Sequence, residues 1–174
     1  MNIKEGIEKR FSVRAFTKEV PDMKLIGEIL KTANAAPSGG NIQPWKVYVL
    51  NEKAKNNLAK ETLQNFDTGV QEEIEYDIYP KPLADEYKKR RYECGADMYN
   101  ALSIKKDDLD SRFKQIRENY NFFGAPIGMI ITIDRSFGSN GWGHVGMFLE
   151  NLWLSAIHFG LGLCLQESWS IYPK

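Results

Sequence analysis

The sequence has little cysteine and histidine, no excess of charge of either sign, and no long apolar run. Its 174 residues include two histidines and two cysteines, Cys94 and Cys164, with no C-x-x-C motif. This usage predicts neither a disulfide framework nor a metal site, and we expect free thiols in a cytoplasmic protein. Lysine plus arginine and aspartate plus glutamate number 23 each. That balance indicates neither nucleic acid nor a membrane surface as a partner.

Several motifs of common protein classes are also missing. No apolar run approaches the ~18 residues of a membrane span, and the N-terminus lacks the pattern of a signal peptide. The chain has no G-x-S-x-G, no H-E-x-x-H and no cysteine with a histidine nearby, which argues against the usual hydrolases. A chain of this length is expected to form one domain, residues 1–174, with a substantial core.

What the sequence does contain is a distinctive loop, A-P-S-G-G-N-I-Q-P-W, at residues 36–45. Pro37 ends the preceding helical pattern, and Gly39 allows a ligand to approach the main chain closely. Ser38 and Asn41 add side-chain donors and acceptors. The loop therefore suits a flat ligand rich in heteroatoms. The alternative is an ordinary turn between a helix and a strand, in which Asn41 only adopts a left-handed conformation.

A second polar segment, R-F-S-V-R, follows the first helical pattern at residues 10–14. Alternate residues of an extended segment face the same side, so Arg10, Ser12 and Arg14 are expected to point together. Arginine binds phosphate through two parallel hydrogen bonds, and this arrangement would hold a phosphate group. The alternative is a solvated basic strand edge.

Periodicity accounts for most of the remaining chain. It predicts helices over residues 2–10, 22–34, 51–66, 83–102, 109–122 and 143–159, and strands over 46–50 and 126–134. The run at 126–134 is nearly continuously apolar, which is typical of a central strand. The helix over 143–159 is apolar nearly all round, so we expect it to be buried in the core or at a subunit interface.

One segment offers a competing interpretation. Gly141, Gly143 and Gly146 fit G-x-G-x-x-G after a predicted strand, and Glu167 lies about twenty residues farther on, as in a dinucleotide-binding Rossmann fold. In that fold the first glycine directly follows the strand. Here six residues, 135–140, intervene, and little chain remains for a second half. Close helix packing explains the small residues better, although a Rossmann dehydrogenase stays as an alternative.

The two polar motifs together resemble those of the FMN-dependent nitroreductase family. A third, weaker match is G-L-G-L-C-L-Q-E-S at residues 160–168, which corresponds to a glycine-punctuated strand after the long helix of that family. The resemblance implies an α+β, three-layer fold with a central, mostly antiparallel sheet flanked by helices. It also implies a homodimer whose interface includes the helix at 143–159.

The resemblance further implies a function and a set of site residues. It implies transfer of hydride from NAD(P)H through FMN to a small acceptor such as a nitroaromatic or a quinone, in a ping-pong order. No metal and no essential catalytic side chain is expected. The implied FMN-binding residues are Arg10, Phe11, Ser12, Arg14, Pro37, Ser38, Gly39, Asn41, Gln166, Glu167 and Ser168. Those at 37–41 would reach the flavin from the partner subunit.

Two departures from the family pattern leave alternatives open. Members of the family continue beyond the last residues of this chain, so we expect a C-terminally truncated form that lacks the last strand and further basic residues. Leu165 and the segment Gln166–Ser168 also stand where many relatives have proline and glycine. A protein that binds flavin without turnover is therefore the second hypothesis.

Overall fold

The computed structural model describes residues 2–173, which form two compact units. Unit 1 comprises Met1–Leu58 and Phe123–Leu165, and unit 2 comprises Ala59–Phe122 and Gln166–Lys174. Within the described part of the chain, no helix is long and apolar enough to cross a membrane. Each unit is described separately below.

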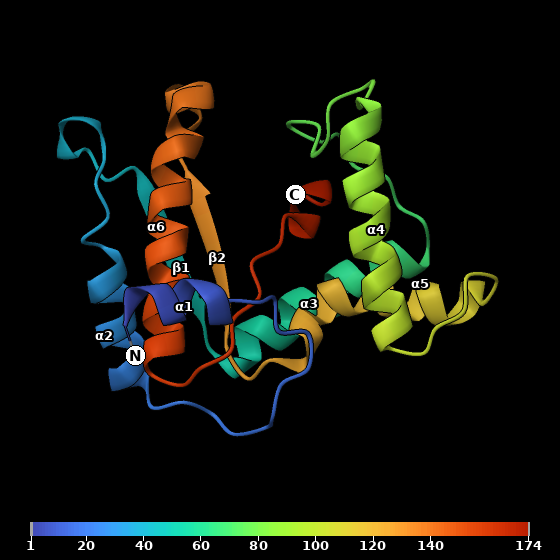
Figure 1. The fold of residues 1–174 in the computed structure, drawn as a ribbon, viewed down its shortest axis with the longest axis horizontal. Coiled ribbons are helices and arrows are strands. Elements are labelled where there is room, and N and C mark those ends of the chain that lie inside the picture. The colour runs from blue at the N-terminus through green and yellow to red at the C-terminus, as the bar shows by residue number, and fades with distance from the viewer. Residues whose placement is uncertain (1, 174) are drawn as a thin grey trace. The chain divides into compact units, whose positions relative to one another are not determined.

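Unit 1 pairs two strands with three helices (Figure 1). Its elements are α1 (Ile3–Lys9), α2 (Met23–Ala33), the short 3-10 helix η1 (Gly39–Asn41), β1 (Trp45–Leu50), the first turns of α3 (Glu52–Asp67), β2 (Gly128–Ile133), η3 (Arg135–Phe137) and α6 (Gly138–His158). The predicted helices at 2–10, 22–34 and 51–66 and the strand at 46–50 are confirmed. The helix at 143–159 is confirmed as well and begins five residues earlier than predicted.

Polar side chains cap the N-termini of three of these helices, at the first residue of each predicted helix. Asn2 and Glu5 form a capping box at α1, and the Asp22 carboxylate accepts a hydrogen bond from the Lys24 N–H at α2. The Asn51 side chain accepts from the Ala54 N–H at 2.8 Å and caps α3, as predicted. Such caps satisfy backbone N–H groups that have no partner inside the helix.

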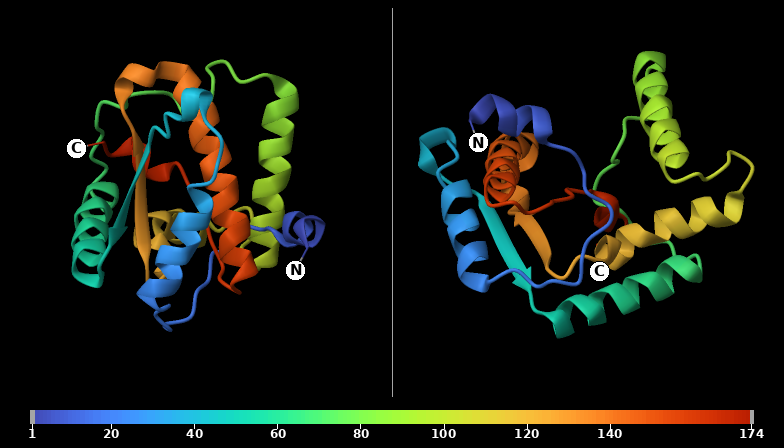
Figure 2. Two further views of the ribbon diagram at one scale, coloured as in Figure 1. Left: turned by 90° about the vertical axis from the view of Figure 1, so that its left-hand side faces the viewer. Right: turned by 60° about the horizontal axis from the view of Figure 1, so that its bottom comes forward.

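The two strands pair antiparallel along their whole length, from Trp45 opposite Ile133 to Leu50 opposite Gly128. Alternate residues face the core, so Val47 and Val49 of β1 lie inward while Lys46 and Tyr48 are exposed. Figures 1 and 2 show α2 and α6 side by side against this sheet. The expected antiparallel sheet flanked by helices is confirmed.

The core of unit 1 is formed by one face of each of these elements. Trp45 stacks on Phe148 with ring centroids 5.0 Å apart. The buried cluster joins α2, the start of β1 and α6, and its members are Ile26, Ile29, Ala33, Ala36, Trp45, Val145, Phe148, Leu152 and Ala156. The buried face of α2 therefore packs against α6.

The glycine pattern at residues 141–146 lies inside α6 rather than in a turn after a strand. A Cβ on Gly141 would collide with the Ile133 side chain and would lie 2.8 Å from Cβ of Phe137. Gly141 therefore allows α6 to pack closely on the end of β2. Because the glycines are helical and the strands are antiparallel, the elements of a Rossmann fold are not present here.

Unit 2 is mostly helical. It contains the rest of α3, then α4 (Asp85–Ala101), α5 (Leu109–Arg117), η2 (Glu118–Gly124, whose last two residues belong to unit 1) and η4 (Ser168–Ile171). Rings of Phe66, Phe113, Tyr120, Trp169 and Tyr172 pack on one another. The expected helix at 83–102 and the loop before it are confirmed.

Three local expectations were wrong. The helix predicted over 109–122 ends as an α-helix at Arg117 and is followed by the 3-10 helix η2, in which Phe122 takes a left-handed backbone conformation (φ 51°) that an α-helix does not permit. Within residues 2–173, β2 pairs with β1 alone, so it is not a central strand; its exposed Thr132 fits a sheet packed on one face. The segment 160–168 forms no strand, because it has no continuous partner; Leu163 O accepts from the Val13 N–H.

Candidate functional site

The loop between α2 and β1 is held by side chains that bond across it. The Ser38 hydroxyl accepts a hydrogen bond from the Gln43 N–H at 2.9 Å, and the Trp45 indole N–H donates to Asn34 Oδ1 at 2.9 Å. Because Trp45 is buried against Phe148, this second bond ties the loop to the core of unit 1. The loop is therefore folded before any ligand arrives.

The tip of the loop needs backbone angles that few residues adopt. Gly40, Asn41 and Gln43 all have φ between 50° and 57°, in the left-handed region that glycine and asparagine tolerate best. The left-handed conformation considered for Asn41 is thus present. Its carboxamide is exposed and forms no hydrogen bond with any described residue. The side chain remains available to a ligand, and its contact with flavin stays a prediction.

The two arginines of the N-terminal motif lie near aromatic rings and have no acidic partner in the described part of the chain. The Arg10 guanidinium lies over the Trp153 ring, 4.5 Å from its centroid, and that of Arg14 lies 5.9 Å from the centroid of Phe123. Among residues 2–173, neither forms an ion pair with a carboxylate. A guanidinium carries five N–H donors in a fixed plane, which match the geometry of a phosphate or carboxylate. Both cations can therefore take an anionic ligand.

The remaining members of that motif contribute less. Phe11 is 67% exposed and Ser12 is half-buried. The segment is irregular backbone rather than a strand edge, and its Val13 N–H donates to Leu163 O at 3.1 Å. The alternative of a basic strand edge is therefore wrong. The segment follows α1 and is bonded to the chain after α6.

Helix α6 contacts both motifs, on opposite faces. A Cβ on Gly39 would lie 3.4 Å from Cε1 of His144, so the loop packs on that ring, whereas Arg10 packs on Trp153. Nine residues separate His144 from Trp153, which corresponds to about 13 Å along a helix and about half a turn around it. Within one chain, Arg10 and the loop at 37–41 are therefore separated by the body of α6.

His144 and Trp153, which contact the two motifs, are not among the residues predicted from the sequence. Both carry a buried ring nitrogen, Nδ1 of His144 and Nε1 of Trp153, without a hydrogen-bond partner among the described residues. A buried polar atom is normally bonded. Each of the two rings contacts one of the two motifs. In the sequence, the feature that could have indicated them is a histidine and a tryptophan inside an otherwise apolar helix.

The predicted site residues of the third motif, Gln166–Ser168, belong to unit 2. The Gln166 side chain donates to Asn119 O at 3.0 Å, and its own oxygen is buried without a partner among the described residues. Glu167 accepts a hydrogen bond from the Tyr76 hydroxyl at 3.3 Å, and Ser168 begins η4. These contacts fix the segment within unit 2. The approach of its backbone to flavin N5 remains a prediction.

The one titratable thiol near the N-terminal motif is held in its neutral form. Burial raises the pKa of Cys164, and the nearby Arg14 opposes that shift only in part. A nucleophilic cysteine requires a depressed pKa. Among residues 2–173, no group of three or more His, Cys, Asp or Glu side chains is placed to hold a metal ion. The described site therefore offers binding groups rather than a nucleophile.

Known proteins of one family resemble this chain over nearly its whole length. The model of the Nitroreductase family matches residues 7–172. A 4-nitrobenzoate reductase of Nocardioides sp. (strain LMS-CY) is 34% identical over 165 residues, which cover 93% of this chain and 67% of that protein. A nitrobenzene nitroreductase of Ectopseudomonas oleovorans is 30% identical over 170 residues, covering 97% and 75%.

Solved structures show the same fold. The FMN and NADPH-dependent nitroreductase NfnB from Sphigopyxis sp. strain HMH superposes with a TM-score of 0.93 at 35% identity, over 99% of this chain and 78% of that one. The FMN-dependent nitroreductase NfnB from Mycobacterium smegmatis in complex with NADPH gives a TM-score of 0.91 at 25% identity, over 97% and 76%.

Proposed function

The chain belongs to the nitroreductase family, and on that basis we propose that it is an FMN-dependent oxidoreductase that reduces nitroaromatic compounds or quinones with NAD(P)H. The family match over residues 7–172, which include all three polar motifs, carries the proposal. The similar proteins named for 4-nitrobenzoate and nitrobenzene reduction support a nitroaromatic acceptor.

The residues of unit 1 fit an FMN group. Arg10 and Arg14 are cations without a carboxylate partner among the described residues, which suits a phosphate. Gly39 and Gly40 are exposed and carry no side chain, and Asn41 presents a carboxamide that can match the alternating donors and acceptors of a pyrimidine edge. When bound, FMN supplies hydride transfer from NAD(P)H to the acceptor, in alternating half-reactions.

The protein's own residues hold and orient that group. Arg10, Ser12 and Arg14 bind the phosphate end, and Pro37, Ser38, Gly39 and Asn41 line the ring. Gln166, Glu167 and Ser168 present main-chain groups near its reactive edge. No side chain is assigned as an obligatory acid or base. Both cysteines are free thiols, which fits a cytoplasmic location.

We also propose that each site is shared by two copies of the chain. Arg10 and the loop at 37–41 contact opposite faces of α6, so one chain does not bring them to the same side of that helix. The face of α1 supports an interface, since Ile3, Ile7 and Phe11 are 78%, 54% and 67% exposed. Exposed apolar surface of this kind is characteristic of a contact between proteins.

The test of the cofactor compares FMN with riboflavin, which lacks the phosphate. Arg10→Ala is expected to weaken FMN binding roughly ten- to a hundredfold and to leave riboflavin nearly unchanged, because one charged hydrogen bond is lost. Equilibrium binding followed by flavin fluorescence measures both. Arg10→Lys is the matched control that keeps the charge over Trp153. Equal losses for the two flavins would assign Arg10 to folding instead.

The shared site is tested by mixing two defective variants. Asn41→Gly keeps the left-handed turn and removes the carboxamide, so it should weaken FMN while the melting temperature without cofactor is unchanged. Unfolded and refolded together, Arg10→Ala and Asn41→Gly chains form hybrid dimers that each contain one intact site, about a quarter of all sites. No recovery of tight FMN binding, or a well-folded monomer in sedimentation, would refute sharing.

Tight binding of FMN without turnover of NAD(P)H would favour a non-catalytic flavoprotein.

A further inference from the structure

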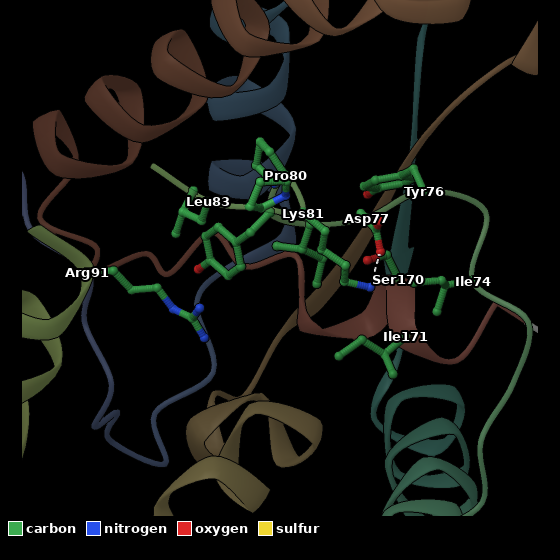
Figure 3. A pocket seen from close by; sticks show the side chains of 12 residues that line it. Ile74, Tyr76, Asp77, Pro80, Lys81, Leu83, Arg91, Ser170 and Ile171 are labelled. Carbon is green, nitrogen blue, oxygen red and sulfur yellow. Dashed lines mark hydrogen bonds and ion pairs between the residues drawn. The ribbon is translucent and has the colours of Figure 1, made fainter. Parts of the chain in front are cut away.

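Unit 2 contains a cavity whose lining includes none of the proposed flavin-binding residues. It has a volume of about 480 Å³ and lies between the loop before α4, α4 itself and η4 (Figure 3). That volume falls in the range of small-molecule sites, about 300–1,000 Å³. All of its lining residues belong to unit 2.

Most of the wall is apolar, and flat groups form a large part of it. The rings of Tyr76 and Tyr79 and the pyrrolidines of Pro80 and Pro82 line the cavity, together with isoleucine side chains such as Ile171. Tyr76 is also fixed by its hydrogen bond to Glu167. Flat, rigid faces favour a planar ligand, because ring stacking adds to the apolar area that is buried.

The charges around the cavity are not balanced. Lys81 and Asp77 form an ion pair at 2.6 Å, drawn as a dashed line in Figure 3, so these two lining charges compensate each other. Arg91 reaches from α4 and lies over the Tyr79 ring, 4.3 Å from its centroid. It forms no ion pair with a carboxylate in the described chain. One positive charge therefore faces the cavity without a counter-ion.

We propose that this cavity binds a planar aromatic carboxylate, with the ring among the tyrosines and prolines and the carboxylate on Arg91. The Arg91 guanidinium carbon lies 4.3 Å from the Tyr79 ring centroid, and the five N–H donors of that guanidinium form no ion pair with a carboxylate in the described chain. They can therefore donate two parallel hydrogen bonds to a carboxylate while the stacking contact is kept. A neutral aromatic ligand would leave this charge uncompensated.

The proposal goes beyond the flavin chemistry, because no part of it requires FMN. It is tested by titrating the protein, with and without saturating FMN, with 2-naphthoate, its neutral analogue 2-naphthamide and the aliphatic anion decanoate. Isothermal titration calorimetry measures all three. We expect naphthoate to bind about tenfold more tightly than naphthamide, an advantage that shrinks as salt screens the exposed arginine. FMN should not alter its affinity.

Two neighbouring arginines provide a matched comparison. Arg91→Gln should remove the advantage of naphthoate and leave naphthamide binding unchanged, whereas Arg91→Lys, which keeps the charge without the planar fork, should retain part of it. Arg90→Gln is the control, since Arg90 pairs with Glu86 at 3.1 Å and does not line the cavity. A circular dichroism melt shows whether each variant is folded.

Several results would overturn the proposal. Equal binding of naphthoate and naphthamide removes the role of the charge, and decanoate binding as tightly as naphthoate removes the role of the ring. Equal loss in Arg90→Gln, or naphthoate binding that appears only with FMN, places the ligand elsewhere. Failure to bind FMN while naphthoate still binds would contradict the proposed oxidoreductase and leave this site standing.

Discussion

The two compact units of this protein are packed in different ways. Unit 1 buries a continuous cluster from α2, β1 and α6, in which Phe148 is only 1% exposed. In unit 2, α4 and α5 contain no buried residue, and the elements are joined by ring contacts such as Phe66 on Phe113 at 4.9 Å. Both units are largely helical, yet the buried cluster of unit 1 is largely aliphatic, whereas unit 2 buries mainly rings such as Tyr120 (3% exposed) and Phe122 (8% exposed).

The two units also carry different proposed binding sites. Unit 1 carries Arg10, Arg14 and the loop at 37–41, and its packing holds those groups in fixed positions. Unit 2 carries the cavity beside α4, whose walls come from a loop and from exposed helix surface. Regions with few buried apolar contacts open at lower free energy than a packed core. We therefore expect unit 2 to adapt to its ligand more readily than unit 1 does.

The largest expected effect tests whether the two units are packed differently, and it comes from truncating one phenylalanine in each unit. Phe148→Ala should lower the free energy of unfolding by about 3–5 kcal/mol, because it leaves a cavity in the core of unit 1. Phe113→Ala in unit 2 should lower it by about 1 kcal/mol, since Phe113 is 47% exposed and loses mainly its ring contact. Urea denaturation followed by circular dichroism measures both. Similar losses would show that the units are packed alike.

A smaller effect on stability is expected at Gly141, where α6 packs closely on the end of β2 in unit 1. Gly141→Ala should destabilise the protein by about 1–3 kcal/mol, because its Cβ would overlap Ile133 and Phe137. Gly27→Ala in α2 is the control, since no atom lies within 4 Å of its added Cβ. There we expect a gain of about 0.5–1 kcal/mol from the lower backbone entropy of alanine. Thermal melts of the two variants should shift in opposite directions.

The smallest effect concerns the ion pair of unit 2. Arg117 donates two hydrogen bonds of 2.8 Å to Asp67, and these bonds lower the pKa of the Asp67 carboxyl. A carboxyl whose pKa is lower when folded stabilises the protein above its unfolded pKa of about 3.9, and this stabilisation is lost as the pH falls through the folded pKa. The pair is partly exposed, so Arg117→Gln should reduce stability only slightly at pH 7.

The small difference in stability between Arg117→Gln and the original protein should vanish in acid, where the Asp67 carboxyl is protonated. Denaturant melts at pH 7 and below pH 3 measure it, with Arg112→Gln as a control because Arg112 lies over Tyr99 and donates to a backbone carbonyl, Lys106 O. A difference that persists unchanged in acid would mean that Arg117 acts through packing rather than through the Asp67 charge.

The sequence by itself determined the elements that depend on local interactions. Periodicity predicted a helix over 22–34, where α2 buries Ile26, Ile29 and Ala33, and a helix over 51–66, whose first residue Asn51 caps α3. Caps and helical periodicity act within a few residues, so they can be recognised without the fold. The motifs at 10–14 and 36–45 likewise identified the family, since motif order and spacing are properties of the chain.

Only the tertiary structure decided the features that depend on distant partners. The segment at 160–168 has the composition of a strand but no strand beside it, and pairing is what makes a strand. The rings under Arg10 and Gly39, Trp153 and His144, lie more than a hundred residues away from them in the chain. The cavity beside Arg91 also includes Ser170 and Ile171 from the far end of the chain. Contacts of this kind are set by which surfaces fold against each other, and no local pattern encodes that choice.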